Sequence, residues 1–231
     1  TYMHYEPYQD RLDILKKSDV FEFYNLQANF DGDLLMRPAG LTGGGIMSLE
    51  RAEVNSKLFS FNANWFGSDT ASLKVFEVGG NLAFKANDLN TYIDLFSRNG
   101  IFYSNGSQSY VELPANQYIT FIDKLKWKMD EESLTLGDTI VNGSGSEFIS
   151  VHPLQDSISF FASTAFYSLK DYIIHANGVK NIDIADASIL PDSGVVTVAK
   201  NAKIETLYSS QIITDRLTKY HLFHNSTVDI N

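Results

Sequence analysis

The stretch from 186 to 228 decides the fold, because it repeats a unit in which a small residue and a polar residue lead into an aliphatic one. The copies are Asp186-Ala187-Ser188-Ile189, Asn201-Ala202-Lys203-Ile204, Ser209-Ser210-Gln211-Ile212 and Asn225-Ser226-Thr227-Val228. Their small residues are 15, 8 and 16 positions apart, close to multiples of eight. An earlier copy is Arg51-Ala52-Glu53-Val54. Eight residues, at about 3.3 Å each, make one strand with a tight corner.

This recurrence predicts an all-β protein with a stacked architecture of the β-solenoid or β-roll kind. A small residue before each strand fits a crowded corner, and a unit that cannot bury its own apolar face must stack on its neighbours. An antiparallel β-sandwich is the alternative, because its strands also recur every 8–12 residues. The spacing alone does not separate the two architectures.

The rest of the chain also has the composition of strands. Val20–Phe30 and Tyr118–Met129 are rich in aromatic and aliphatic residues, and Asp31-Gly32 is typical of a hairpin turn. One short segment, 10–17, has the apolar spacing and the basic last turn of a helix. We therefore predict an N-terminal lead-in with a short helix (1–19), a β-rich segment (20–141) and a regular β-repeat segment (147–231). A Gly/Ser-rich linker at 142–146 separates the last two, although the chain can also be one continuous unit.

Composition limits the classes of partner. The 231 residues include 18 Lys and Arg against 28 Asp and Glu, a formal net charge of −10. An acidic chain does not provide the basic surface that attracts nucleic acid. There is no Cys, which excludes disulfides, thiolate catalysis and Cys-based metal sites. No apolar run reaches the roughly 18 residues of a transmembrane span. Both ends interrupt a pattern, as expected of a segment from a longer protein.

The motifs that carry catalysis or bind cofactors are missing. His221 and His224 are three apart and point to opposite faces of a strand, so a shared metal ion is not expected. The glycine run 40–45 lacks the Gly-Lys-Ser/Thr of a phosphate-binding loop. Asp130-Glu131-Glu132 is the densest acidic cluster, and a solvated turn is the simplest interpretation. We predict no catalytic residue, no metal site and no cofactor.

Two tryptophans are the candidate ligand-binding residues. Aromatic residues make up 13% of the chain, and they either fill a β core or stack on sugar rings. Trp65, in Asn62-Ala63-Asn64-Trp65-Phe66, fits the core better than a binding face. Trp127 lies between Lys126 and Lys128, which favours the binding interpretation slightly more.

Several segments resemble the very large, repetitive envelope proteins of Bacteroidota. These segments are 38–45, 51–54, 59–61, 68–71, 150–157, 176–179 and 184–191, for example Pro38-Ala39-Gly40-Leu41 and Ile184-Ala185-Asp186-Ala187. The texture of the last segment is also similar to the β-taco repeats of lipopolysaccharide-transport bridges. The resemblance implies export to the periplasm, the outer membrane or the cell surface. It also draws attention to Asp-Ser/Thr-apolar triplets, which such bacteria O-glycosylate, at Thr70, Thr139 and Ser157.

The sequence therefore predicts a non-catalytic structural β-repeat segment of a large exported envelope protein, with an apolar groove as an optional feature. Its expected partners are neighbouring repeats of the same parent chain or copies of it, with a glycan or a lipid as a further candidate. A carbohydrate-binding β-sandwich is the alternative. A glycoside-active enzyme with two facing carboxylates stays open as a third, because such a pair is spatial and not sequential.

Overall fold

The computed structural model describes residues 1–106, 109–137, 145–155, 158–214 and 221–230, and every regular element in this part is a β-strand. The all-β class is therefore confirmed, whereas the helix predicted at 10–17 is wrong: this segment forms the strand Arg11–Leu15. The chain groups into two compact units. The first contains Thr1–Ser109 and Lys128–Asp130, and the second contains Tyr110–Trp127 and Glu131–Asn231. The predicted linker at 142–146 lies mostly outside the described residues.

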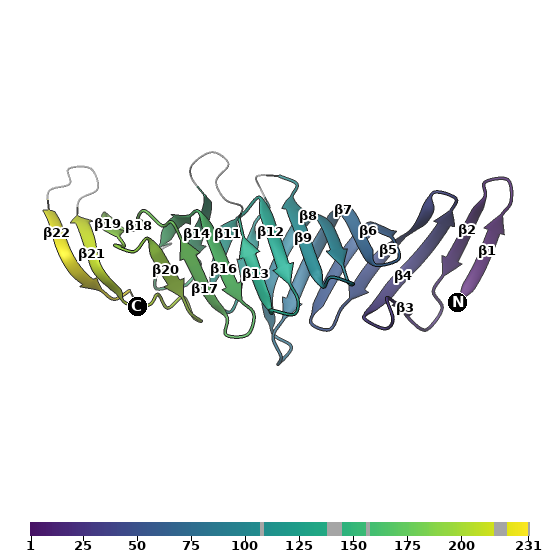
Figure 1. Ribbon diagram of the computed structural model, residues 1–231, viewed down its shortest axis with the longest axis horizontal. Helices are drawn as coiled ribbons and strands as arrows, with labels where there is room; N and C mark the ends of the chain where they lie inside the picture. Colours follow the sequence, from purple (N-terminus) through teal and green to yellow (C-terminus); the bar gives the residue numbers. More distant parts are fainter. Residues whose placement is uncertain (107–108, 138–144, 156–157, 215–220, 231) are drawn as a thin grey trace. The chain divides into compact units, whose positions relative to one another are not determined.

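The first unit is an antiparallel meander, drawn from purple to teal in Figure 1. Its strands are β1 (Tyr2–Glu6), β2 (Arg11–Leu15), β3 (Phe21–Phe23), β4 (Ala28–Arg37), β5 (Gly40–Ser48), β6 (Ala52–Phe61), β7 (Trp65–Phe76), β8 (Leu82–Asp94) and β9 (Asn99–Ser104). Both β2 and β3 pair with β4, which in turn pairs with β5. From β5 to β9, each strand pairs with the next.

The strands of the first unit bend where their ladders shift register. Irregularities occur between Gly43 and Gly45 in the β5–β6 ladder and between Ser68 and Ala71 in the β7–β8 ladder. Bulges of this kind bend a strand and increase its twist. The buried hydroxyl of Ser56 stabilises the bend, because it accepts the Leu58 amide at 3.0 Å and donates to the Thr70 carbonyl at 2.7 Å.

A cluster of aromatic rings forms the core of the first unit. Phe30, Phe59 and Phe66 are fully buried, and their ring centroids lie 5.7–6.0 Å apart in edge-to-face contacts. Burying one such ring stabilises the fold by about 1.5–3 kcal/mol. The Tyr24 ring packs on Phe66, and its hydroxyl donates to the Trp65 carbonyl at 2.9 Å. Alternate residues of β4 and β6 thus point into one shared core.

The second unit contains two antiparallel ladders, which we call the long ladder and the short ladder. In the long ladder, β10 (Val111–Leu113), β11 (Tyr118–Phe121), β14 (Ser146–Ser150), β15 (Ser159–Ala162), β18 (Ile182–Ile184), β19 (Ala187–Leu190), β21 (Leu207–Thr214) and β22 (His221–Val228) pair in this order. In the short ladder, β13 (Ser133–Leu136), β16 (Thr164–Ser168), β17 (Ile173–Asn177) and β20 (Val195–Val198) pair in this order. The amide of Gly137, just beyond β13, donates at 2.9 Å to the carbonyl of Lys124 in β12 (Lys124–Lys128).

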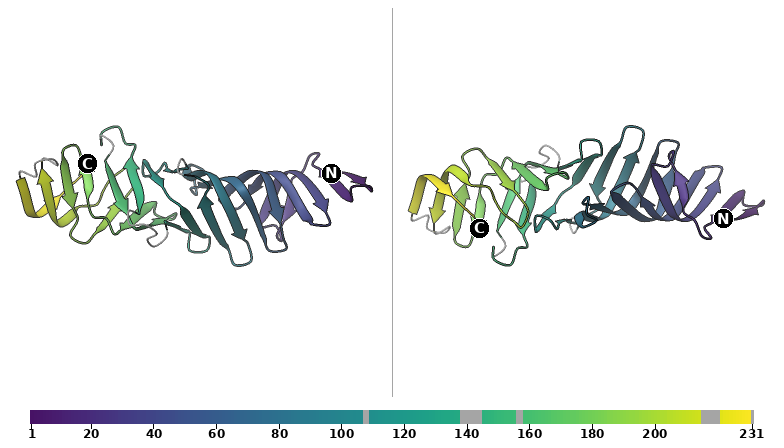
Figure 2. Two further views of the ribbon diagram at one scale, coloured as in Figure 1. Left: turned by 90° about the horizontal axis from the view of Figure 1, so that it is seen from above. Right: turned by 90° about the horizontal axis from the view of Figure 1, so that it is seen from below.

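The chain delivers hairpins to the two ladders in turn. The hairpin β10–β11 belongs to the long ladder, β12–β13 leads into the short one, β14–β15 returns to the long one, and β16–β17 to the short one. Each ladder therefore joins segments that are distant in sequence. Figure 1 labels strands of both ladders, and Figure 2 shows the same part of the chain, in green and yellow, from above and from below.

Each ladder has one buried face. In the short ladder, Ala165, Tyr167, Ile174 and Val196 are buried, while the residues between them are more exposed. The buried side chain of Asn116 connects the ladders, because its Nδ2 donates to the Tyr172 carbonyl at 2.8 Å and to the Val198 carbonyl at 3.1 Å. These contacts fix the position of β20, which borders the candidate site.

The recurring unit of the sequence has more than one structural role. Ala52 and Ala187 begin strands, as predicted. Ile204 instead forms an isolated bridge with Val198. The copies at 209–212 and 225–228 lie inside or at the end of β21 and β22, where Ser209 and Asn225 have positive φ. In these later copies the small residue therefore lies at a backbone irregularity and does not begin a strand.

Candidate binding surfaces

A groove lies along one edge of β20 in the second unit. Its volume is about 380 Å³, and its lining comes from the β19–β20 turn, from β20, from the segment that leads into β21 and from the first residues of β21. The lining residues are Pro191, Asp192, Ser193, Val195, Thr197, Glu205, Thr206, Leu207, Tyr208, Ser209 and Ser210. Two carboxylates and several hydroxyl groups thus share the groove with apolar side chains.

Hydrogen bonds show which way the backbone of β20 faces. The Gly194 carbonyl accepts the amide of Val179, just beyond the end of β17, at 2.9 Å. Backbone groups of successive strand residues point to opposite edges. Val195 and Thr197 therefore direct their backbone groups away from β17, toward the groove. The Glu205 amide confirms this direction, because it donates to the Thr197 carbonyl at 3.0 Å.

Part of this edge of β20 has no backbone partner. Among the described residues, none donates to the Val195 carbonyl or accepts from the Thr197 amide. The Val195 amide reaches only the hydroxyl of Ser193, at 3.2 Å. The chain turns away at Asn201 and Ala202, both of which have positive φ. A short free strand edge therefore borders the groove.

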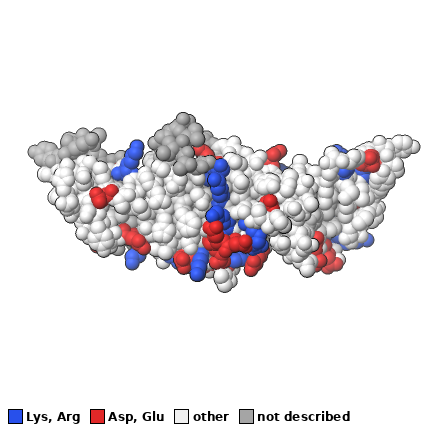
Figure 3. Space-filling model, in the orientation of Figure 1, with Lys and Arg blue, Asp and Glu red and all other residues white. Residues whose placement is uncertain are grey.

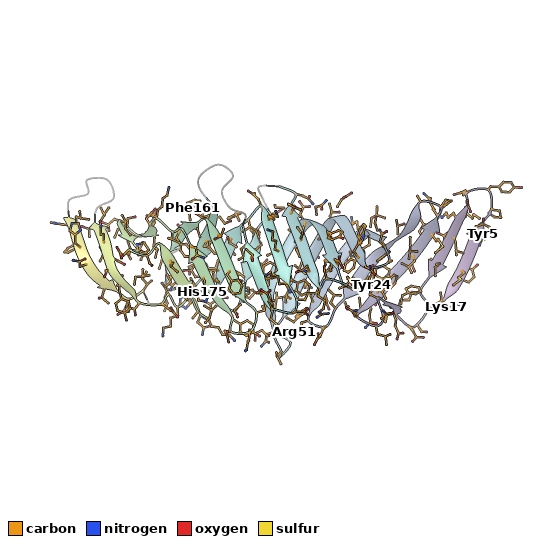
Figure 4. The ribbon with its side chains drawn as sticks, in the orientation of Figure 1. Tyr5, Lys17, Tyr24, Arg51, Phe161 and His175 are labelled. Carbon is orange, nitrogen blue, oxygen red and sulfur yellow. The ribbon has the colours of Figure 1, made fainter. Side chains whose placement is uncertain are left out.

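The outward face of the short ladder carries a row of side chains without Lys, Arg, Asp or Glu. Thr135, Phe166, His175 and Thr197 lie opposite one another across successive strands. Nδ1 of His175 and Oγ1 of Thr197 are 3.4 Å apart. Figure 3 shows this face largely free of charge over β16 and β17, and Figure 4 labels His175 on β17. The row ends at the groove, because Thr197 lines it.

The predicted ligand-binding tryptophans have different environments. Trp127 is 6% exposed, so it is a core residue of the second unit. Trp65, in the first unit, is half-buried, and its ring lies 5.0 Å from that of Tyr92, which is partly exposed. Asp94 lies opposite Trp65 in the β7–β8 ladder. Of the two tryptophans, Trp65 therefore offers part of an aromatic surface to a ligand, and Trp127 does not.

One of the three predicted O-glycosylation residues can be located. Thr70 is exposed on β7, next to the register shift of the β7–β8 ladder. Its backbone amide donates to the Ser68 hydroxyl at 3.1 Å. Thr139 and Ser157 lie outside the described residues. Glycosylation stays a prediction at all three positions.

Two tyrosines have strongly shifted acidities. Burial raises the pKa of the Tyr118 hydroxyl well above its usual value. Burial also raises the pKa of the Tyr24 hydroxyl. Tyr118 faces the core of the second unit, and the nearby Ser150 side chain offsets only part of the effect of burial. Neither group lines the groove.

In the described part of the chain, no group of three or more His, Asp or Glu side chains is arranged to hold a metal ion. Nor does that part contain an apolar helix of membrane-spanning length. Sequence reasoning missed the groove, because its walls come together only through the pairing of β17 with β20 and of β19 with β21.

Comparison with known proteins gives no match: no protein-family model, curated protein sequence or solved structure is similar to this chain.

Proposed function

We propose that the chain is a non-catalytic structural segment of a large exported cell-envelope protein, in the periplasm, the outer membrane or at the cell surface. In this proposal, hairpins stack in register as in an open β-solenoid or β-roll. Each layer shields the apolar side of the one before. The partners are neighbouring repeats of the same parent chain or copies of it.

The alternation of hairpins between two ladders supports this proposal most directly. The hairpins β10–β11, β14–β15 and β18–β19 follow one another along the long ladder, separated in the chain by strands of the short ladder. Such a pattern can be extended by adding hairpins, without a change in the layers already present. It is the arrangement expected of a modular scaffold and not of a fold built around one active site.

The outermost strands support the proposed partners. Among the described residues, β1 pairs only with β2, and β22 pairs only with β21. Met3 on β1 and Leu222 and Phe223 on β22 are exposed. A free strand edge beside apolar side chains is a template for pairing with another strand. Neighbouring repeats or copies would cover these edges.

Small-angle X-ray scattering tests the proposal. A compact protein of this length has a radius of gyration of about 17 Å. The stacked scaffold predicts a clearly larger value at low concentration and a further rise with concentration as free edges pair. Met3→Lys and Phe223→Lys together should abolish that rise, whereas Leu154→Lys, in a loop, should not. A radius of gyration near that of a compact protein would contradict the proposal.

A carbohydrate-binding module is the second candidate, and the pairing of Trp65 with Tyr92 favours it. The two rings, tilted against each other, provide an apolar face, and Asp94, which lies opposite Trp65 in the ladder, provides an acceptor for sugar hydroxyls. A glycan array tests this candidate. Binding that is lost in Trp65→Ala and kept in Tyr208→Ala, an exposed tyrosine of the other unit, would support it. An array without signal would exclude the glycans that it carries.

A further inference from the structure

The short ladder differs from the long one at β20. The chain supplies it with the hairpin β16–β17, but β20 follows as a single strand. After β20, the chain makes only the bridge between Val198 and Ile204 before it enters β21. No further strand therefore pairs with β20 beside Val195 and Thr197, whereas the preceding strands of the ladder each pair with the next one.

The groove occupies the place where the next strand of the short ladder would run. Val195 and Thr197, whose backbone groups point toward it, are also two of its lining residues. The three residues from Val195 to Thr197 span about 10 Å in a strand. A groove of about 380 Å³ along such an edge accommodates a short extended peptide segment.

The side chains of the groove indicate the chemistry of that segment. Val195 and Leu207 are apolar, Thr206 and Tyr208 carry hydroxyls, and Lys and Arg are absent from the lining. The carboxylates of Asp192 and Glu205 give the groove a negative charge. The complementary ligand is an extended strand with apolar residues at alternate positions and a basic residue at its end.

We infer that the outer edge of β20 is a strand-acceptor site, which binds an extended basic peptide segment by β-strand addition. The Thr197 amide donates to the incoming backbone, and the Val195 carbonyl accepts from it. Asp192 and Glu205 select basic over acidic segments. The inference rests on the proposed scaffold function and deepens it, because it adds a lateral docking site to the end-to-end contacts of β1 and β22.

Fluorescence anisotropy with the complete chain tests the site. The probe is a labelled six-residue peptide in which valine and threonine alternate between two terminal lysines. We expect saturable binding, weakened roughly tenfold by Thr197→Pro, since one backbone hydrogen bond is lost. Thr197→Val keeps the amide and should bind within about twofold of the unmodified chain. Equal binding by the proline and valine variants would overturn the inference.

The charge of the groove gives a second test. A peptide with terminal glutamates in place of the lysines should bind several-fold more weakly, and added salt should reduce the difference. The double variant Asp192→Asn and Glu205→Gln should bind both peptides about equally. If the unmodified chain does not distinguish the two peptides, the assigned selectivity is wrong.

Amide hydrogen exchange keeps the inference testable if Thr197→Pro does not fold. Saturating lysine peptide should slow the exchange of the Thr197 amide in the unmodified chain and leave the exchange of the amide of Val78, an exposed residue of the first unit, unchanged. An unchanged Thr197 amide overturns the strand-acceptor site. The scattering experiment distinguishes this failure from failure of the scaffold, because a large radius of gyration without peptide binding leaves the scaffold intact.

Discussion

Asn116 and Val198 lie 82 positions apart in the chain, yet Nδ2 of Asn116 donates a hydrogen bond to the Val198 carbonyl at 3.1 Å. The same amide group donates to the Tyr172 carbonyl at 2.8 Å. One fully buried side chain thus connects the turn after β10 with the start of β17 and the end of β20. It positions the strand that borders the groove.

Asn116→Leu should destabilise the second unit by about 3 kcal/mol, because two buried carbonyl groups lose their shared donor. Urea denaturation followed by circular dichroism measures this change in the free energy of unfolding. The matched control is Asn177→Ala, at an exposed position of β17, which should change the free energy of unfolding by less than about 0.5 kcal/mol. Similar losses in the two variants would show that Asn116 does not connect the ladders.

The second prediction concerns the close approach of β4 and β5. Gly32 and Gly45 lie opposite each other, and a Cβ on Gly45 would lie 2.2 Å from the Asp31 carbonyl oxygen. Gly45 also has a φ of 154°, which side chains rarely adopt. Gly45→Ala should therefore lower the free energy of unfolding by at least about 2 kcal/mol. Gly79→Ala, in an open turn, should be nearly neutral, and equal melting temperatures of the two variants would contradict the prediction.

These glycines show what local sequence patterns predict well and what they do not. A run of glycines such as 40–45 is typical of a place where side chains would obstruct, and Gly43, Gly44 and Gly45 do lie against backbone oxygens. However, Asp31-Gly32 is not a hairpin turn but the middle of β4, because Gly32 is needed for the same close approach. A turn and a tight strand crossing favour the same residue type, so composition alone cannot separate them.

The segment 118–129 shows how an alternating apolar pattern mispredicts the buried face when the chain leaves one ladder for another. If 118–129 formed a single strand, its alternation would place Ile119, Phe121, Leu125 and Trp127 on one face. The structure instead forms β11 and β12, and it buries Tyr118, Leu125 and Trp127 while Ile119 and Phe121 lie on the more exposed side. The reversal occurs at the connection between the two strands. The helix expected at 10–17 failed for a related reason, because pairing with β1 and β4 overrides a weak local preference.

The third prediction concerns two tyrosines, the buried Tyr118 and the half-buried Tyr24. Burial raises the pKa of Tyr118 above the value of 10.0 that it has in an unfolded chain. Its contribution to stability is therefore complete below about pH 10 and is lost as the pH rises above it, since only the unfolded chain then ionises. Stability should fall above about pH 10, and Tyr118→Phe should make that fall less steep. Denaturation series at several alkaline pH values measure the slope, and an unchanged slope would contradict the assignment.

The hydroxyls of the two tyrosines should also differ at neutral pH. The Tyr118 hydroxyl makes no hydrogen bond of good geometry, although Ser150 lies beside it, so Tyr118→Phe should leave the free energy of unfolding nearly unchanged. The Tyr24 hydroxyl donates to the Trp65 carbonyl, so Tyr24→Phe should cost about 1 kcal/mol. Urea denaturation of both variants at neutral pH provides the comparison. A larger loss for Tyr118→Phe would show that its hydroxyl does have a partner.

The fourth prediction separates the two tryptophans by their surroundings. Trp127→Phe leaves the half-buried Trp65, whose fluorescence should be red-shifted and readily quenched by acrylamide. Trp65→Phe leaves Trp127, which is 6% exposed and should emit at shorter wavelength with little quenching. Truncation should show the same order: Trp127→Ala costs about 3–5 kcal/mol, as expected for a core aromatic residue, and Trp65→Ala costs clearly less. Equal quenching of the two single-tryptophan variants would place Trp65 in the core and remove the aromatic surface on which the carbohydrate-binding candidate depends.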